Sequence, residues 1–221
     1  VWVYLRNAAS DQRISKGIGL RADYRKLLKQ IGQTYGVSPE IILAIWGLET
    51  GFGEDMGAFN VIEALATLGF EGRRAEFGRT EMIAALKIID QGHVKMANMV
   101  GSWAGAMGHT QFTPTTFLRT AVDHNGDGKR DIWGNMGDVF ASTANHLAES
   151  GWHKGESWGF EVRLPKNFNY ADADPTIVKT LGDWIDRGVV RINGKPLTQG
   201  GMPRSAPAAI FVPAGHTGAA F

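Results

Sequence analysis

Apolar residues recur every three or four positions through the first two thirds of the chain, the spacing of amphipathic helices. This pattern and its capping signals predict helices over 22–35, 40–49, 61–68, 79–90, 114–121 and about 138–147. After Trp152, glycine, proline and asparagine become frequent. The short runs predicted there are strands at 159–164, 188–192 and 208–212 and a helix around 176–186. We therefore expect an α+β chain that is mainly α, with a helical lobe over 1–152 and a small strand-containing lobe over 153–221.

The predicted helix 40–49 ends on a carboxylate. At about 100° per residue, its apolar face is formed by Ile41, Ile42, Ile45 and Leu48. Glu49 falls at nearly the same angle as Ile42 and precedes a Gly-Phe-Gly segment at 51–53. Loss of water contact there would raise the pKa of Glu49, as a general acid near neutral pH requires. The alternative is a half-buried structural glutamate that backbone donors or an arginine satisfy.

An Asp-rich loop matches the first part of an EF-hand calcium loop. The expected oxygen ligands are Asp123, Asn125, Asp127, the carbonyl of Lys129, Asp131 and, as a weaker candidate that could instead cap a helix, Asp138. Gly128 occupies the position of the sharp turn, but Gly134 stands where the usual loop has a bidentate glutamate. We expect a structural Ca²⁺ ion in this loop that links the helices before and after it. The alternative is an Asx-turn loop without a metal.

Segment 101–114 is rich in small residues, which allow backbone groups to approach a ligand closely. The candidate ligand-contacting residues, through hydrogen bonds or aromatic stacking on sugar rings, are Ser102, Gln111, Trp103, Phe112 and Phe77. Close packing of this loop under the helix that starts at 114 is an equally good explanation. The Arg73-Arg74 pair is either a solvated turn or a group that binds a substrate carbonyl or carboxylate.

Composition narrows the classes of function. The 221 residues include 23 basic and 22 acidic side chains and no cysteine. This excludes a disulfide framework, a thiolate nucleophile and a cysteine metal site, and no basic stripe indicates a nucleic-acid partner. No apolar run reaches the length of a membrane span. Because the chain starts without a methionine or signal peptide, we expect a mature form that has lost any export signal or lipid anchor upstream.

Several motifs in order resemble the membrane-bound lytic murein transglycosylase B family of bacterial peptidoglycan-cleaving enzymes. They are Tyr35–Ile42, Gly47–Gly53, Ala64–Leu68, Arg73–Glu76, Gly101–Pro114, Asp123–Trp133, Ala144–Leu147 and Gly151-Trp152. The resemblance implies a lysozyme-like helical core, a small additional lobe and an EF-hand-like loop. It aligns the family's catalytic glutamate with Glu49. Substrate-contacting positions align with Arg74, Ser102, Gln111 and Phe112, and with Phe77, where a known member has tyrosine. Family chains continue past the stretch matched by 218–221 into a segment that is absent here.

The resemblance implies cleavage of the MurNAc–GlcNAc β-1,4 bond to give 1,6-anhydromuramoyl products, with Glu49 as acid and then base. The expected partner is a peptidoglycan glycan strand, and the expected protein is a monomer in the periplasm of a Gram-negative cell. Two alternatives remain open. One is a hydrolytic muramidase, in which a second acid such as Glu63 or Glu76 activates water. The other is a calcium-stabilised peptidoglycan-binding scaffold without catalytic activity.

Overall fold

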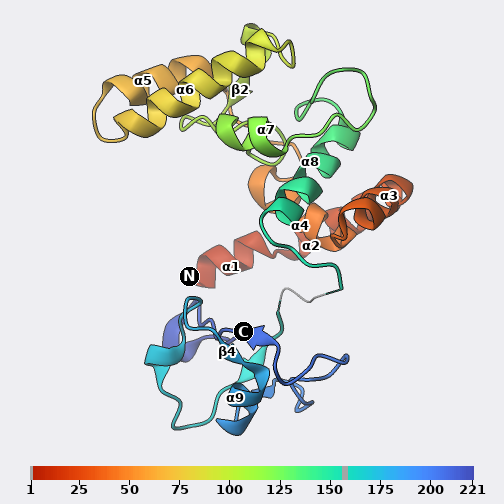
Figure 1. Ribbon diagram of the computed structural model, residues 1–221, viewed down its shortest axis with the longest axis vertical. Helices are drawn as coiled ribbons and strands as arrows, with labels where there is room; N and C mark the ends of the chain where they lie inside the picture. The colour runs from red at the N-terminus through yellow and green to blue at the C-terminus, as the bar shows by residue number, and fades with distance from the viewer. Residues whose placement is uncertain (1, 156–158) are drawn as a thin grey trace. The chain divides into compact units, whose positions relative to one another are not determined.

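The computed structural model describes residues 2–155 and 159–221, and these form a mainly helical α+β chain (Figure 1). The chain divides into two compact units, Ala8–Glu156 and a second unit that joins Val1–Asn7 to Ser157–Phe221. The helix α1 (Trp2–Ala8) therefore falls mostly in the second unit, whereas the expected lobe 1–152 included it. Apolar periodicity shows that a segment has a face to bury, but it does not show which distant segment covers that face.

The first unit carries seven α-helices among its described residues. They are α2 (Asp11–Asp23), α3 (Arg25–Tyr35), α4 (Pro39–Thr50), α5 (Val61–Phe70), α6 (Ala75–Asp90), α7 (Pro114–Thr120) and α8 (Met136–Glu149). A short 3₁₀ helix, η1 (Met96–Asn98), precedes the strand β2 (Val100–Gly101), which pairs antiparallel with β1 (Phe59–Asn60). This small pair joins the start of α5 to the loop that leads toward α7.

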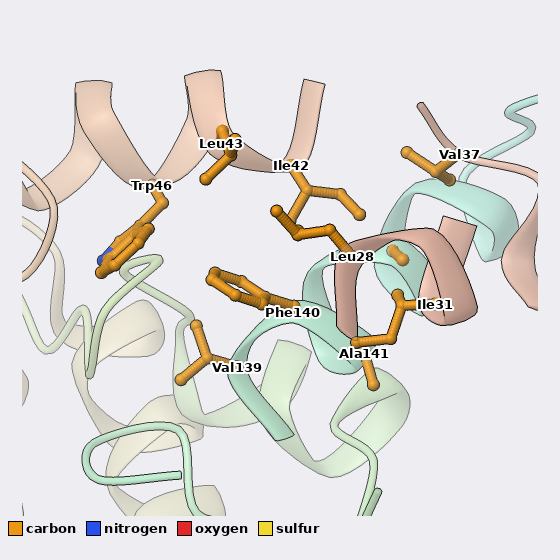
Figure 2. Packing of buried hydrophobic residues seen from close by; sticks show 10 residues of the cluster. Leu28, Ile31, Val37, Ile42, Leu43, Trp46, Val139, Phe140 and Ala141 are labelled. Atoms are coloured by element: carbon orange, nitrogen blue, oxygen red, sulfur yellow. The ribbon is translucent and has the colours of Figure 1, made fainter. Parts of the chain in front are cut away.

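One core of this unit lies where α3, α4 and α8 meet (Figure 2). Its buried residues include Leu28 and Ile31 from α3, Ile42 and Trp46 from α4, and Phe140 from α8. The rings of Trp46 and Phe140 meet edge to face, with centroids 5.3 Å apart. Aromatic pairs of this geometry contribute beyond the area they bury. The core therefore fixes the direction of α4, on whose last turn Glu49 lies.

A second core lies between the α5–α6 hairpin and α7. The helices α5 and α6 lie side by side in Figure 1, and Gly69 and Gly78 face each other where the two meet. A methyl group added at Gly78 would clash with the backbone of Gly69, so both glycines permit this close approach. Leu65 and Phe117 are fully buried in the resulting core.

Residues 159–221 of the second unit form short antiparallel strand pairs and one α-helix. β3 (Val162–Arg163) pairs with β5 (Val190–Arg191), β4 (Lys179–Thr180) pairs with β6 (Pro207–Ala208), and α9 (Leu181–Asp186) follows β4. Two further 3₁₀ helices are η2 (Tyr170–Asp172) and η3 (Gly215–Thr217). The core of this unit is centred on Trp184, which is 1% exposed.

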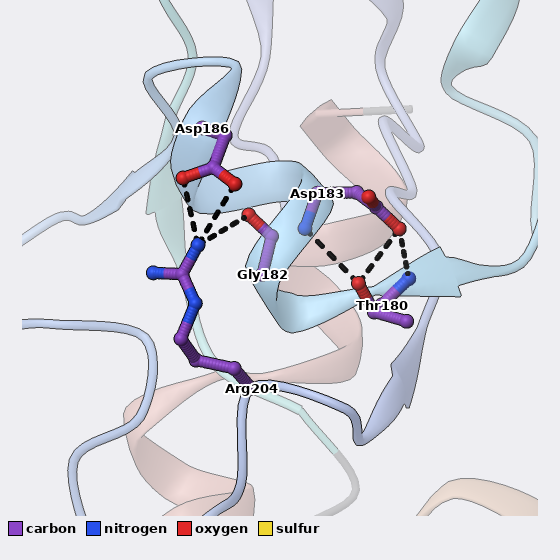
Figure 3. A network of polar contacts seen from close by, with 5 residues as sticks. All are labelled: Thr180, Gly182, Asp183, Asp186 and Arg204. Atoms are coloured by element: carbon purple, nitrogen blue, oxygen red, sulfur yellow. Dashed lines mark hydrogen bonds and ion pairs between the residues drawn. The ribbon is translucent and has the colours of Figure 1, made fainter.

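Polar contacts define both ends of α9 (Figure 3). At its start, Thr180 and Asp183 form a capping box: the Thr180 hydroxyl accepts from the Asp183 backbone, and the Asp183 carboxylate accepts from the Thr180 backbone. Near its end, the Arg204 guanidinium reaches both carboxylate oxygens of Asp186 at 2.7 and 2.8 Å and the Gly182 carbonyl at 3.4 Å. These contacts tie the loop before β6 to the helix.

Most of the predicted elements are present, but their limits differ. The single helix expected over 22–35 is broken at Tyr24, and the part before it belongs to α2, which begins at Asp11. The helix expected around 176–186 begins only at Leu181, because residues 179–180 form the strand β4. None of the helices that the structure describes is both long and apolar enough to cross a bilayer.

Candidate active site

Glu49 lies on the last turn of α4, next to the helix end. The buried face of α4 consists of Ile42, Leu43, Trp46, Gly47 and Thr50. This face is rotated from the expected stripe, in which Ile41, Ile45 and Leu48 also pointed to the core; Leu48 is in fact 53% exposed. Glu49 therefore lies at the edge of the buried face and is exposed. The apolar periodicity did not predict the buried face here, because nearly every position of α4 is apolar. The sequence therefore offers no polar face that would show which side points to solvent.

Partial burial nevertheless changes the protonation of Glu49. Loss of water contact is the cause that raises the pKa of its carboxyl above the ordinary value. Among the described residues, no basic side chain lies within ion-pairing distance of Glu49 to oppose this effect. The expectation of a raised pKa therefore holds in direction. A carboxyl group of this kind stays protonated closer to neutral pH, as a general acid must.

The backbone turns sharply directly after Glu49. Gly51, Phe52 and Gly53 follow one another with φ angles of 62°, 67° and 83°, and Gly51 caps α4 in the left-handed conformation. Phe52 is not a glycine, so its left-handed conformation is strained and must be held by its surroundings. Its ring packs edge to face on Trp46, with centroids 5.4 Å apart.

Thr50 and His109 hold this turn in place. The Thr50 hydroxyl donates to the His109 carbonyl at 2.7 Å and accepts from the Gly53 backbone N–H at 3.0 Å. The His109 Nδ1 atom in turn accepts from the indole N–H of Trp46 at 2.9 Å. The end of α4 is thus hydrogen-bonded to a loop about 60 residues further along the chain.

The Trp46 hydrogen bond requires a neutral His109 ring with its proton on Nε2. Burial is the main cause that lowers the pKa of His109, while a hydrogen bond to the Trp133 backbone and the charge of Asp131 act in the opposite direction. The ring also packs directly against Gly53, where a Cβ atom would overlap it. His109 therefore acts as an anchor of the turn that follows Glu49.

The sequence indicated only that His109 is a solvent-exposed or hydrogen-bonding residue and not a metal ligand, and it did not identify the partners of His109 or the roles of Lys16 and Thr50. The Lys16 ammonium group donates to the Gly51 carbonyl at 3.1 Å and to the Glu54 carboxylate at 2.6 Å, across the same turn. No local pattern could have revealed these side chains, because each acts on a segment more than 30 residues away.

Ser102 serves the fold of its own loop. Its hydroxyl oxygen accepts from the backbone N–H groups of Ala104 and Ala106, at 3.3 and 3.0 Å. These bonds close the small-residue loop that follows β2. The structure therefore shows a structural role for Ser102, and a substrate contact by Ser102 remains a prediction.

Gln111 also organises the backbone around it. Its side-chain amide donates to the carbonyls of Gly108 and Met56, at 2.9 and 3.2 Å, and its own φ angle is 53°. The bond to Met56 links this loop to the segment that follows the turn at Gly51–Gly53. The loop that carries Gln111 is thus hydrogen-bonded to the segment that follows the end of α4, although no hydrogen bond joins the side chains of Gln111 and Glu49.

The aromatic candidates differ in exposure. Phe112 is 5% exposed and packs in the second core with its ring tilted against His146. Phe77 is half-buried, and the Arg74 guanidinium lies 4.1 Å from its ring centroid. Trp103 is 60% exposed and is therefore the candidate ring most open to a ligand.

The Asp-rich loop is ordered by its own carboxylates. Asp123 accepts backbone N–H bonds from Gly126, Asp127 and Gly128, at 2.7–3.2 Å. The pKa of the Asp127 carboxyl is lowered mainly by a hydrogen bond from the Asn125 side chain. The hydrogen bond that Asp127 accepts from the Lys129 backbone N–H lowers it further. In the part of the chain that the structure describes, no group of three acidic or histidine side chains is close enough to hold a metal ion. The ligand types suit Ca²⁺, but the arrangement is that of an Asx-turn loop.

Asp138 is fully buried and clamps this loop from α8. Its two oxygens accept from the backbone N–H groups of His124 and Asp131, each at 2.8 Å. The competing role foreseen for it, capping the helix, belongs instead to Asn135, whose side chain accepts from the first N–H groups of α8. Burial is the main cause that raises the pKa of Asp138.

The family model for the transglycosylase SLT domain matches residues 1–221. The chain belongs to the transglycosylase SLT domain family. Membrane-bound lytic murein transglycosylase B of Escherichia coli (strain K12) is 37% identical to it over 154 residues, which are 69% of this chain and 42% of that protein. This SLT domain therefore matches less than half of the length of that relative.

Solved structures agree with this assignment. SltB3 of Pseudomonas aeruginosa, solved in complex with NAG-anhNAM-pentapeptide, is 50% identical with a TM-score of 0.93, over 99% of this chain and 58% of that one. Slt35 of Escherichia coli, solved in complex with calcium, is 28% identical with a TM-score of 0.84, over 99% of this chain and 67% of that one. The expected lysozyme-like, mainly helical fold is confirmed by these relatives.

The packing of His109 against Gly53 gives a direct test of the turn. We expect Gly53→Ala to lower the free energy of unfolding by roughly 2–4 kcal/mol, because it adds left-handed strain and an overlap with the His109 ring. Chemical denaturation followed by circular dichroism measures this change.

Gly72→Ala is the matched control, because Gly72 has a φ angle of 90° and no atom within 4 Å of an added Cβ. It carries the backbone strain alone and should cost about 1 kcal/mol. Equal losses in the two variants would show that the His109 contact does not hold the turn.

Proposed function

We propose that this SLT domain is a lytic transglycosylase that cleaves peptidoglycan glycan strands, with Glu49 as the single acid and base. The observation that carries the proposal is the family match over residues 1–221. Further support comes from SltB3, which was solved with fragments that combine NAG with either NAM or anhNAM and a pentapeptide. Glu49 has the raised pKa and the rigid backbone support that a general acid needs.

The proposed reaction uses one carboxyl group twice. Protonated Glu49 donates its proton to the oxygen that links N-acetylmuramic acid to N-acetylglucosamine, and the bond from C1 of the muramoyl residue to that oxygen breaks. The Glu49 carboxylate then accepts the proton of the muramoyl 6-hydroxyl as that oxygen forms a new bond to C1. The proton returns to Glu49, a 1,6-anhydro ring forms, and no water is consumed.

The other nearby carboxylates are engaged or lie on other elements. Glu54 is held by Lys16, and Asp55 accepts the backbone N–H of Gly57 at 3.1 Å. Glu63 and Glu76, the candidate second acids of a hydrolase, lie in the first turns of α5 and α6. A mechanism with an internal nucleophile needs none of them, whereas an ordinary glycosidase needs a second carboxylate.

Replacing Glu49 by glutamine should lower the rate of release of soluble muropeptides about 10²–10⁴-fold, because the amide cannot donate the proton. In the unchanged protein, the rate should fall as pH rises through the pKa of Glu49. Since that pKa is raised, this fall should occur above the pH range in which an ordinary glutamate ionises. Reversed-phase chromatography of muropeptides over a pH series measures both effects.

Glu63→Gln and Glu76→Gln are the matched controls, since both positions are exposed and each change also removes one carboxylate. Both should retain nearly full activity. A Glu49→Gln protein with unchanged activity would exclude the assigned role, and a large loss in either control would favour a hydrolase with two carboxylates.

We also propose that the Asp-rich loop binds a structural Ca²⁺ ion through Asp123, Asn125, Asp127, Asp131 and the Lys129 carbonyl. Calcium is present in the solved complex of Slt35. The residues present carry oxygen ligands at EF-hand spacing, the ligand type that Ca²⁺ takes in proteins. Asp138 remains a weaker ligand in this proposal, because two backbone donors already occupy it.

Calcium at about one hundred times its Kd should raise the melting temperature by about 5–10 °C, because the ion binds only the folded loop. Asp127→Asn should greatly reduce this rise. Asp174→Asn should not, although Asp174 in the second unit resembles Asp127 in accepting the backbone N–H two residues later. Scanning fluorimetry with Ca²⁺, Mg²⁺ and EDTA measures the shift; an equal rise in Asp127→Asn would exclude this loop as the site.

The remaining expectations stay proposals for this chain. We assign substrate contacts to Arg74, Phe77, Ser102, Gln111 and Phe112, although Phe112 reaches a ligand only if the second core opens beside it. We place the protein as a monomer in the periplasm, where its proposed substrate lies. The name of the Escherichia coli relative, a membrane-bound transglycosylase, agrees with attachment to a membrane there.

A further inference from the structure

A pocket of about 720 Å³ lies between α6 and α7, away from the turn that carries Glu49. Arg79, Ile83 and Lys87 line it at intervals of four residues, so they form one face of α6. Leu118 and Arg119 line it from α7. The pocket thus lies wholly within the first unit.

The two walls of this pocket are fixed to each other. The carboxylate of Glu81, which is buried on α6, accepts from the backbone N–H and from the hydroxyl of Thr115 on α7, at 2.8 and 2.7 Å. The pocket is therefore held open by the packing of the helices that form it.

The charge of the pocket is one-sided. Three of its eight lining residues, Arg79, Lys87 and Arg119, are cationic, and none of the eight is acidic. Within the described residues, none of these three cations forms an ion pair with a carboxylate. All three are exposed, and Arg79 uses only its Nε atom, in a hydrogen bond to the Gly69 carbonyl at 3.2 Å.

Part of the pocket lining is apolar. Ala84 is 5% exposed, Ile83 is 51% exposed, and Leu118 is half-buried. A pocket lined by both cationic and apolar side chains suits a ligand that carries both carboxylates and short aliphatic groups. A bare inorganic anion would leave the apolar side chains unused, and a neutral sugar would leave the cations without partners.

We propose that this pocket, lined by Arg79, Lys87 and Arg119, binds the acidic peptide stems of peptidoglycan, at a distance from the cleaved bond. The proposal rests on the proposed function for the identity of the polymer. Such stems combine free carboxylates with alanine methyl groups, which match the cationic and the apolar side chains that line the pocket. Binding there would retain the protein on strands that still carry peptides.

The test measures binding without cleavage. The full 221-residue protein with Glu49→Gln is co-sedimented with intact sacculi and with bead-coupled glycan strands from which an amidase has removed the stems. Adding Arg79→Gln, Lys87→Gln and Arg119→Gln should weaken apparent affinity for intact sacculi about tenfold, because three charge contacts are lost. Affinity for stripped glycan should change less than about twofold.

The matched control carries Arg6→Gln, Lys26→Gln and Lys166→Gln, which remove the same charge from exposed positions outside the pocket. It should retain most of its affinity for intact sacculi. Lys87→Gln alone, at an exposed position whose side chain makes no hydrogen bond to the described residues, provides a variant that keeps the fold if the triple variant unfolds.

Three outcomes would overturn the proposal. They are unchanged binding of the pocket variants, an equal loss on intact sacculi and on stripped glycan strands, and an equal loss in the control. Equal loss on both polymers would assign the cations to the glycan or to other polymer anions instead of the stems. The experiment measures binding and requires no cleavage. Its result can therefore be interpreted even if the proposed catalytic role of Glu49 is wrong.

Discussion

The candidate site depends on the hydrogen bonds that join the end of α4 to His109. Trp46 donates to the imidazole, Thr50 donates to the His109 carbonyl, and Gly53 packs against the ring. Three consecutive residues after the end of α4, Gly51–Gly53, have left-handed backbone conformations. Such a strained turn persists only where contacts with the surrounding structure hold it in place. The loop that contains His109 makes these contacts. The packing of the other helices of the first unit places that loop next to the end of α4.

The chemistry assigned to Glu49 follows from an incomplete burial. A fully buried carboxyl group could not reach a polymer, and a fully exposed one would ionise in the ordinary range. Glu49 lies at the edge of the buried face, where its side chain is accessible and its pKa is still raised by lost hydration. The core of α3, α4 and α8 produces this balance, because it fixes how far α4 is rotated into the protein.

The sequence predicted well those features that depend on local pattern. The helices α4, α5 and α8 and the position of Glu49 at a helix end followed from apolar spacing, capping residues and glycines. It predicted poorly the features that depend on distant partners. The rotation of α4, the placement of α1 with the second unit, and the contacts of His109 and Lys16 all require segments that are far apart in the chain. The family resemblance carried the functional expectation further than the residue pattern did, because motif order over the whole chain is more specific than any single motif.

The central claim is that Glu49 directs an internal attack that consumes no water. It is tested most directly by cleaving sacculi in water enriched with ¹⁸O and measuring the masses of the released muropeptides. The account predicts anhydromuramoyl products that are lighter by one water than reducing ends and that carry no ¹⁸O. Products that retain the mass of a reducing end and incorporate one ¹⁸O atom during cleavage would contradict it, because a water molecule activated by a second carboxylate would then be the nucleophile.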